Sequence, residues 1–449
     1  MKVKQLTIML IFLLTLPFFL NYSLPTKTVF AQTSPSLYVG VDVAFESIAA
    51  TEQLIDNISA YTNLFVIGCY GNYNETRLNI ISQYVYDKGL SFIVYTDDPR
   101  YPSRQWFENA SIDWGNRFLG IYFYDEPGGK QLDQSSYPIV TEADNLSDAA
   151  TQYVNTLNWW LRSGRHAITS SFPSSTNYEL FTSDYSLYWY DYQAGYDTVF
   201  AEFALNYDRA LNIDLCRGAA TVQNKSWGVM ITNKYTLWPY MENESELYND
   251  MKLAYENGAK YIIVFDSDVN WTQNVLLKPQ QDAMRQFWQY AQTHPRTISP
   301  VSERAAYVLP EDYTYGFRSP TQDRIWGLWN SDSPDIPLLK EYSNLTLQIS
   351  MGVAALFRVF GNNLDIVYPD ASRTIESVGY SNVVYWNDSR LISNLTATTS
   401  PNGSVVQATQ SPEYKQNSSS TFYVIAACVL ATFVAVETVL MLKIRRLER

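Results

Sequence analysis

The chain from about residue 37 to about residue 293 alternates short apolar segments with longer segments whose apolar residues recur every three or four positions. The short segments are rich in β-branched and aromatic residues, which is typical of parallel strands that are buried on both faces. Eight of them are predicted to be strands: Leu37–Val43, Leu64–Tyr70, Ser91–Tyr95, Phe118–Tyr124, His166–Ser170, Thr198–Phe203, Trp227–Thr232 and Tyr261–Phe265.

The longer segments have the spacing of amphipathic helices. In Glu75–Lys88, the residues Leu78, Ile81 and Val85 fall on one face, and Gly89 then supplies a helix stop. Further helices are predicted at Thr51–Ala60, Asp144–Arg162, Ser245–Asn257 and Val275–Gln292.

Eight strand–helix units in one segment of roughly 250 residues are typical of a (β/α)8 TIM barrel. We therefore predict an α/β protein whose barrel occupies residues 36–298. An open, doubly wound sheet is the alternative. It is less favoured because the sequence shows no Gly-rich phosphate-binding turn.

The pattern changes after Pro300. Strand-like segments at Ala305–Leu309, Leu364–Tyr368 and Val383–Tyr385 flank a partly helical stretch at Leu338–Phe360. We predict a small α/β domain over residues 299–395. Residues 396–421 are rich in Ser, Thr, Asn, Gln and Pro, which indicates a polar stalk.

Both ends of the chain carry membrane-related patterns. Residues 1–31 combine a basic start, an apolar core and small residues at a cleavage position, as in a secretory signal peptide; a retained N-terminal anchor is the alternative. Residues 422–444 are long and apolar enough to cross a bilayer, and the arginines of the tail 445–449 place that tail in the cytoplasm. We predict a single-pass type I protein of the cell membrane with an extracellular ectodomain.

Composition narrows the function classes. The net charge of −13 argues against nucleic acid as a partner. Only two histidines and three cysteines are present, which argues against a His-ligated metal cluster, a Ser-His-Asp triad and a disulfide framework. No cofactor and no metal ion are expected. Many Asn-x-Ser/Thr tripeptides predict N-glycosylation of an exported chain.

The segment Phe118–Pro127 reads Phe-Leu-Gly-Ile-Tyr-Phe-Tyr-Asp-Glu-Pro and is the strongest candidate for chemistry. An apolar strand ends there in two carboxylates, Asp125 and Glu126. The carboxyl ends of barrel strands form the active sites of TIM-barrel enzymes. The alternative is a helix start, with Asp125 as the cap and Pro127 in the first turn.

The other predicted strand ends also carry acidic, amide and aromatic side chains, and such a rim suits a neutral polyhydroxylated ligand. Glu202, at the end of the sixth strand, is a second candidate catalytic carboxylate. The predicted substrate-binding residues are Asp42, Tyr70, Tyr124, Asn206, Asn233, Tyr235, Asp266 and Trp271.

Asp125-Glu126-Pro127 resembles the Asn-Glu-Pro motif of the retaining TIM-barrel glycosidases, which implies that Glu126 is the acid/base. That group takes its nucleophile from a glutamate at the end of strand seven, where this sequence reads Ile231-Thr232-Asn233. The adjacent Asp-Glu pair is also similar to the substrate-assisted N-acetylhexosaminidases. On that resemblance Asp125 orients an acetamido group and Glu126 donates a proton.

The sequence therefore predicts a cell-surface-anchored glycoside hydrolase that acts on extracellular carbohydrate, with Glu126 as the general acid. The alternative is a non-catalytic surface glycoprotein, or a carbohydrate-binding envelope protein on a degenerate barrel. The predicted small domain is faintly similar to the α/β domain that follows the barrel in some β-galactosidase-like enzymes, so an oligomer is possible.

Overall fold

The computed structural model describes residues 36–44, 47–68, 74–98, 101–134, 138–169, 178–318, 324–342, 344–370 and 373–388. The predicted signal peptide, stalk, transmembrane helix and cytoplasmic tail lie outside the described residues. Tyr70, one of the predicted substrate-binding residues, also lies outside them.

Eight parallel strands close into a barrel in sequence order, which confirms the predicted (β/α)8 fold. The strands are β1 (Tyr38–Val43), β2 (Leu64–Ile67), β3 (Ser91–Thr96), β4 (Phe118–Phe123), β5 (Glu179–Asp184), β6 (Thr198–Phe203), β7 (Ser226–Ile231) and β8 (Tyr261–Phe265). Pairing of β1 with β8 completes the barrel.

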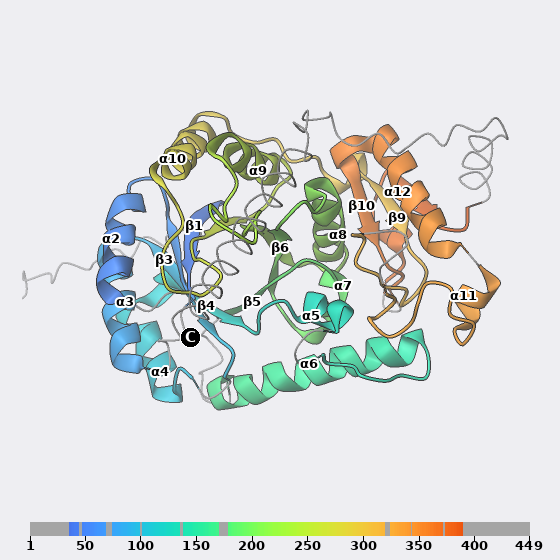
Figure 1. Cartoon of the computed structure of the whole chain (residues 1–449), viewed down its shortest axis with the longest axis horizontal. Coiled ribbons are helices and arrows are strands. Elements are labelled where there is room, and N and C mark those ends of the chain that lie inside the picture. The colour runs from blue at the N-terminus through green and yellow to red at the C-terminus, as the bar shows by residue number, and fades with distance from the viewer. Residues whose placement is uncertain are drawn as a thin grey trace, which may run out of the picture. The chain divides into compact units, whose positions relative to one another are not determined.

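Helices surround the barrel (Figure 1). They are α2 (Ile48–Ile58), α3 (Glu75–Asp87), α4 (Arg104–Asp113), α5 (Pro127–Asp133), α6 (Leu146–Thr169), α7 (Tyr188–Ala194), α8 (Arg209–Val222), α9 (Glu244–Glu256) and α10 (Lys278–Thr293). Several begin at a capping side chain that accepts backbone N–H groups of the first turn; Asn74, Ser103, Asp208 and Asn243 do so.

The prediction of the fifth strand was wrong. Residues up to Thr169 belong to the 24-residue helix α6, and β5 instead spans Glu179–Asp184. A short apolar run such as Ala167-Ile168 cannot be assigned to helix or strand by periodicity alone. The true strand is harder to see because it begins with Glu179 and ends with Asp184, residue types that are rare in strands.

Aromatic side chains fill the inside of the barrel. The rings of Tyr38 and Tyr261 stack at 4.9 Å, and Phe181 stacks on Phe200 at 5.6 Å. Gly120 of β4 has φ 151°, and a Cβ atom there would lie 2.0 Å from a backbone oxygen of β5. Glycine at this position therefore lets β4 and β5, which carry much of the candidate site, approach each other.

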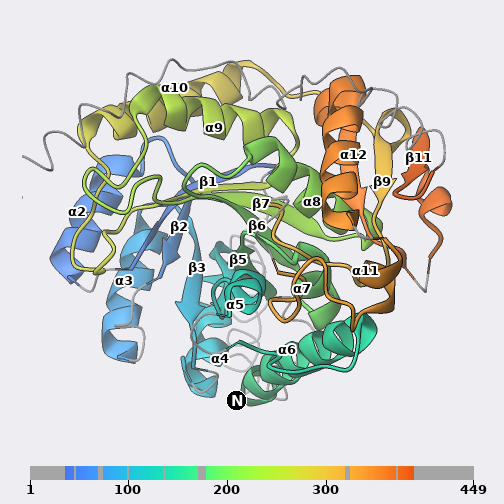
Figure 2. The same ribbon diagram turned by 45° about the vertical axis from the view of Figure 1, so that its right-hand side comes forward.

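A second, three-stranded parallel sheet follows the barrel, in the order β10-β9-β11, and confirms the predicted small α/β unit. Its strands are β9 (Ala305–Val308), β10 (Leu364–Val367) and β11 (Asn382–Tyr385), and its helices are α11 (Pro337–Glu341) and α12 (Leu345–Phe360). Figure 2 shows α12 and β9 beside the barrel helix α8. Gly218 of α8 allows this packing, because a Cβ atom there would meet the Ile366 carbonyl at 2.6 Å.

Among the described residues, Leu345–Asn363 is the stretch long and apolar enough to cross a membrane by length and composition. It contains α12, which buries Leu345, Ile349 and Leu356. Since α12 packs against β9 and β10, its apolar residues are explained in part by the core of the small unit.

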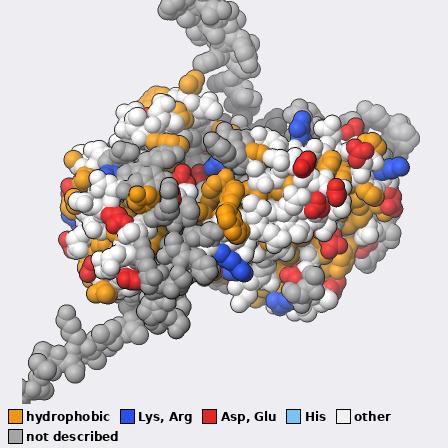
Figure 3. Space-filling view, turned by 90° about the horizontal axis from the view of Figure 1, so that it is seen from below, with side chains coloured by type: hydrophobic (Ala, Val, Ile, Leu, Met, Phe, Trp, Pro, Cys, Tyr) orange, Lys and Arg blue, Asp and Glu red, His pale blue; other side chains and the backbone are white. Residues whose placement is uncertain are grey.

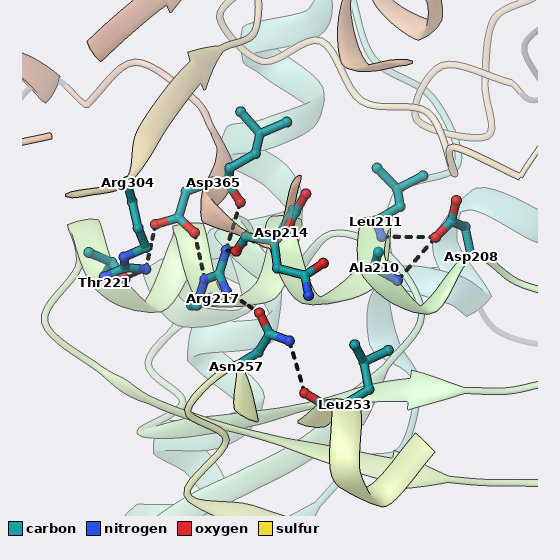
Figure 4. A network of polar contacts seen from close by, with 12 residues as sticks. Asp208, Ala210, Leu211, Asp214, Arg217, Thr221, Leu253, Asn257, Arg304 and Asp365 are labelled. Atoms are coloured by element: carbon teal, nitrogen blue, oxygen red, sulfur yellow. Dashed lines mark hydrogen bonds and ion pairs between the residues drawn. The ribbon is translucent and has the colours of Figure 1, made fainter. Parts of the chain in front are cut away.

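A buried ionic network joins the small sheet to the barrel (Figure 4). Asp365 of β10 is fully buried and accepts hydrogen bonds of 2.7 Å from both Arg217 of α8 and Arg304. The Tyr380 hydroxyl donates to the same carboxylate at 2.8 Å. Arg217 also donates to Asn257 at 2.9 Å. Asp365 thus pairs with both buried guanidinium groups, and the buried Asp214 adds a second carboxylate 3.3 Å from Arg217.

Asp365→Ala should lower the free energy of unfolding by about 3–5 kcal/mol, because it leaves Arg304 buried without its anion and Arg217 with Asp214 alone. Urea unfolding of the purified protein measures this. Asp282 is the matched control, since it pairs with Lys278 and Arg285 on an exposed surface, and Asp282→Ala should cost less than about 1 kcal/mol. Equal losses for the two variants would contradict the assignment of Asp365 as the joint between barrel and sheet.

Candidate active site

A cavity of about 700 Å³ opens at the carboxyl ends of the barrel strands. It brings together seven of the predicted site residues: Asp42, Tyr124, Asp125, Glu126, Glu202, Asn233 and Trp271. Side chains that sequence reasoning did not assign also line it: Tyr95, Tyr122, Lys130, Tyr185, Tyr207, Met230 and Phe265.

Three predicted substrate-binding residues do not line this cavity. Asn206 is exposed, and Tyr235 lies on the β7–α9 loop with 44% of its surface exposed. Asp266 is fully buried, and its Oδ1 accepts the N–H groups of Val275 and Leu276 at 2.6 and 2.7 Å. These hydrogen bonds fix the β8–α10 loop. The role of Asp266 as a substrate ligand stays a prediction, since its Oδ2 is buried without a hydrogen bond among the described residues.

Glu126 stands at an unusual turn between β4 and α5. Its backbone is left-handed, with φ 51° and ψ 47°, and Tyr124 two residues earlier has φ 56°. Such conformations cost about 1–3 kcal/mol each for residues with a side chain, and they persist where the surroundings enforce them. Here the Glu126 N–H donates to the Ser183 carbonyl of β5 at 3.1 Å.

The helix-cap alternative is half right. Pro127 occupies the first turn of α5, but neither Asp125 nor Glu126 caps that helix with its side chain. The fully buried Asp184 of β5 does so instead, accepting the N–H groups of Gly128 and Gly129, the latter at 2.8 Å. The carboxyls of Asp125 and Glu126 are thereby left to face the cavity.

The carboxyls are joined through hydroxyl groups. Ser183 donates to Glu202 Oε1 at 2.6 Å and lies 3.0 Å from Asp125 Oδ1, and the Tyr122 hydroxyl contacts both Asp125 and Ser183. Two hydroxyl protons thus serve four close contacts between oxygen atoms. This shortage of protons favours a protonated carboxyl within the group.

Glu126 has the electrostatics of a proton donor. Burial, followed by the neighbouring carboxyl of Asp125, raises the pKa of Glu126 from 4.5 to about 7. The ammonium of Lys130 and the neighbouring Glu202 act in the opposite direction and lower the pKa of Glu126. Burial and the carboxyls of Glu126 and Asp125 raise the pKa of Glu202 well above its ordinary value, so the two glutamates titrate as a pair.

Lys130 of α5 is the basic side chain among the described residues that line the cavity. Its ammonium donates to the Asp125 carbonyl, lies 3.9 Å from Asp125 Oδ2 and sits 5.5 Å from the centre of the Tyr124 ring. Lys130 therefore offsets part of the negative charge of the cavity, and is itself held by groups of the protein.

Asp42, at the end of β1, carries a buried oxygen without a protein partner. Only 3% of its surface is exposed, and Oδ1 makes no hydrogen bond. Burial and then the Asp125 carboxyl raise the pKa of Asp42 well above its ordinary value. Gly68 makes room for this oxygen, since a Cβ atom there would lie 2.1 Å from it. A buried polar atom that is left unsatisfied is costly, so Asp42 marks a place for a ligand hydroxyl or N–H group.

An aromatic wall faces these carboxyls. Tyr185 and Tyr207 lie with their ring centres 5.8 Å apart. Gly129 lets Tyr185 lie against α5, because a Cβ atom there would meet the ring at 2.0 Å. Arg318, from the segment that follows β9, stands 5.3 Å from the Tyr185 ring and binds Asp133, which also accepts the Tyr185 hydroxyl at 2.7 Å. The second unit thus braces one wall of the cavity.

Within the described residues, no three His, Cys, Asp or Glu side chains come together as a metal-binding group. The negative cavity with aromatic walls can bind uncharged hydrogen-bonding ligands, and Glu126 can donate a proton to them.

No model of a protein family matches the sequence, and neither does a curated protein. A psychrophilic glycoside hydrolase family 10 endo-β-1,4-xylanase aligns over 56% of this chain and 96% of its own, with 10% identity and a TM-score of 0.35. An α-L-fucosidase isoenzyme 2 from Paenibacillus thiaminolyticus aligns over 77% of this chain and 59% of its own, with 12% identity and a TM-score of 0.44.

A GH99 endo-α-mannosidase from Bacteriodes thetaiotaomicron aligns over 55% of this chain and 84% of its own, with 11% identity and a TM-score of 0.35. Barrel enzymes of other chemistry align as well, including an HpcH/HpaI aldolase. The closed eight-stranded barrel, seen in the strand pairing itself, makes the chain a TIM-barrel protein, and these alignments report distant likeness alone. They do not select an activity.

Glu126→Gln should change how stability depends on pH. The pKa of Glu126 is about 7 when folded against 4.5 ordinarily, so the folded state binds more protons between these values. The stabilisation that Glu126 contributes is complete below about pH 4.5 and is lost as the pH rises through about 7. From about pH 5 to about pH 8, the wild type should lose on the order of 2–3 kcal/mol more than Glu126→Gln.

Urea unfolding at a series of pH values tests this. The exposed Glu303 provides the control, and Glu303→Gln should follow the wild-type curve. If Glu126→Gln also runs parallel to the wild type, the raised pKa of Glu126 is refuted.

Proposed function

We propose that the protein hydrolyses glycosidic bonds and that Glu126 is the general acid. One observation carries the proposal: a glutamate with a pKa of about 7 is held by a strained turn at the carboxyl end of β4 and faces a cavity. Glycoside hydrolysis requires a carboxylic acid that is still protonated near neutral pH, so that it can protonate the leaving oxygen.

The position of Glu202 supports a role in tuning Glu126. The Glu126 carboxyl is one of the causes that raise the pKa of Glu202. Glu202 in turn lowers the pKa of Glu126, against the effect of burial, so it limits how far that pKa rises.

Asp125 is the better candidate for the second catalytic group. Its Oδ1 is held by the Tyr122 and Ser183 hydroxyls, and its side chain faces the cavity beside Glu126. This arrangement suits the substrate-assisted mechanism, in which Asp125 orients an acetamido group whose oxygen attacks the anomeric carbon. Turnover of N-acetylhexosaminides but not of the matching hexosides would support this mechanism, and equal turnover would oppose it.

The substrate class follows from the lining. Among the described residues that line the cavity, the carboxyls of Asp42, Asp97, Asp125, Glu126 and Glu202 outnumber the ammonium of Lys130. Anionic sugars are therefore disfavoured, and neutral sugars fit the aromatic walls and the free oxygen of Asp42. On the face drawn in Figure 3, acidic and basic side chains lie singly among neutral ones, which gives no support to a polyanionic partner.

Location is part of the proposal and rests on the sequence. A signal peptide over residues 1–31 and a membrane helix over residues 422–444 would place the barrel outside the cell, anchored by a stalk. Extracellular carbohydrate is then the substrate that the barrel meets.

A second candidate function is a carbohydrate-binding surface protein without catalysis. One observation favours it: strand seven leads to Asn233, where retaining glycosidases carry a glutamate. Binding of a glycan that is not hydrolysed during a long incubation would support this second function over the first.

Glu126→Gln should lower kcat by about 10²–10⁴-fold on any glycoside that the wild type hydrolyses, because the amide cannot donate the required proton in the same way. Glu303→Gln should retain wild-type rates. Release of reducing sugar measures both. A Glu126→Gln enzyme with unchanged kcat would refute the assignment of the general acid.

The pH profile gives an independent test. Glu126 must be protonated to act, so kcat/KM should fall as the pH rises above about 7. A rate that stays level to well above that value would show that a group with a higher pKa supplies the proton.

A further inference from the structure

Large apolar side chains are exposed on three consecutive loops at the rim of the cavity. Leu205 follows β6, Tyr235, Leu237 and Trp238 lie between β7 and α9, and Val269 and Trp271 lie between β8 and α10. Leu237 is 75% exposed and Trp238 is 58% exposed. We call these six residues the rim platform. Their exposure is unfavourable in water and calls for a ligand.

The β7–α9 loop holds its part of the platform in a fixed shape. The Tyr235 N–H donates to the Tyr240 carbonyl at 2.8 Å, and the Tyr240 N–H donates to the Leu237 carbonyl at 2.9 Å. Met241 is buried behind them, and the rings of Trp238 and Tyr240 meet edge to face at 6.2 Å. The exposed side chains therefore sit on a loop that is closed on itself.

The β8–α10 loop is fixed in the same manner. Asp268 is nearly fully buried and accepts the Thr272 N–H at 2.7 Å and the Thr272 hydroxyl at 2.8 Å. Together with the hydrogen bonds of Asp266, this holds Trp271 at the rim in a left-handed conformation with φ 55°. A surface that is ordered before binding loses little entropy when a ligand arrives.

The rim platform reaches the cavity at two of its members, because Leu205 and Trp271 line the cavity itself. The Leu205 N–H donates to the Asn233 carbonyl at 3.1 Å, and Asn233 is both a cavity residue and near the start of the loop that carries Tyr235 and Trp238. A ligand that extends from the cavity over the ends of β6, β7 and β8 meets the loops that carry these side chains.

We propose that the rim platform binds successive sugar units of a neutral carbohydrate chain, so that the protein acts on a polymer or long glycan rather than on a single terminal sugar. This inference rests on the proposed function for the nature of the ligand. Flat aromatic faces present a large apolar area at low entropic cost, which suits the apolar faces of sugar rings.

A lipid surface fits the platform less well. The ammonium of Lys234, beside the Tyr235 ring, is paired with Glu246 at 2.6 Å, and the chain carries a net charge of −13. Binding to an anionic membrane draws on free basic residues near the apolar ones. The charge around the platform favours an uncharged ligand.

Trp238→Ala tests the inference, because Trp238 belongs to the platform but does not line the cavity. We expect KM or Kd to rise by about 3- to 10-fold for chains of six sugar units, because the variant loses one aromatic contact with the chain. The same constants should stay unchanged for a disaccharide or a chromogenic monoglycoside. Trp159→Ala is the matched control, since Trp159 is 66% exposed on α6 and lies outside the platform.

The probes are N-acetylglucosamine oligomers of two to six units and the neutral polysaccharides xylan, mannan and laminarin. They are tested against protein carrying Asn270→Gln, because a glycan on the sequon at Asn270 would cover the neighbouring Trp271. An equal effect of Trp238→Ala on short and long ligands, or binding of none of these probes by the parent protein, would overturn the inference. Loss of binding to neutral phospholipid vesicles in Trp238→Ala, with carbohydrate affinity intact, would assign the platform to a membrane instead.

These results separate the two proposals. Binding of long chains that depends on Trp238, without hydrolysis, refutes the enzyme and keeps the platform. Hydrolysis that depends on Glu126 but is indifferent to Trp238 at every chain length refutes the platform and keeps the enzyme.

Discussion

The cap of α5 by Asp184 is the interaction on which the candidate site depends. Asp184 sits at the end of β5, is fully buried and accepts N–H groups from Gly128, Gly129, Tyr185 and Ser186. Burial raises its pKa to about 6, while these hydrogen bonds work in the opposite direction. A helix usually takes its cap from the preceding residue. Because a neighbouring strand supplies it here, the two carboxyls before α5 are released from local bonding and can serve the cavity.

Several carboxyls in one cavity impose the second constraint. Like charges in a dry site cannot all ionise, so part of the group must hold protons near neutral pH. The structure limits the repulsion by placing Ser183 and Tyr122 between Asp125 and Glu202, and Lys130 beside Asp125. The same cluster of carboxyls therefore supplies protonated groups near neutral pH and gives the cavity its acidic lining. That lining also disfavours anionic ligands.

The sequence predicted the parts of this arrangement that lie on regular elements. The pattern of short apolar segments located seven of the eight barrel strands. The predicted end of the fourth strand placed Asp125 and Glu126 at the rim of the barrel. Ser183 and Asp184 were missed because both lie on β5, whose polar ends conceal a strand and whose position was assigned to the end of α6. The length of α6, which exceeds an ordinary barrel helix, was the available signal.

Other residues were missed because their roles depend on distant contacts. Tyr122 alternates inward on β4, and no local pattern says that its hydroxyl will meet Asp125. Tyr185 and Tyr207 become a wall only when Asp133 and Arg318 hold them. Nothing in the sequence indicated that one oxygen of Asp266, at the end of β8, would fix its own loop through two backbone N–H groups.

The small unit is best understood as part of the site. Gln131 of α5 donates to the Trp326 carbonyl at 2.9 Å, and Trp326 is fully buried against Tyr153 and Tyr190 of the barrel. Arg318 reaches Asp133 at the end of the same short helix. A seven-residue helix has little stability of its own. Contacts from the second unit therefore hold α5, and through α5 the turn that carries Glu126. The Asp365 network joins the small sheet to α8, and so helps to keep beside the barrel the segments that contact α5.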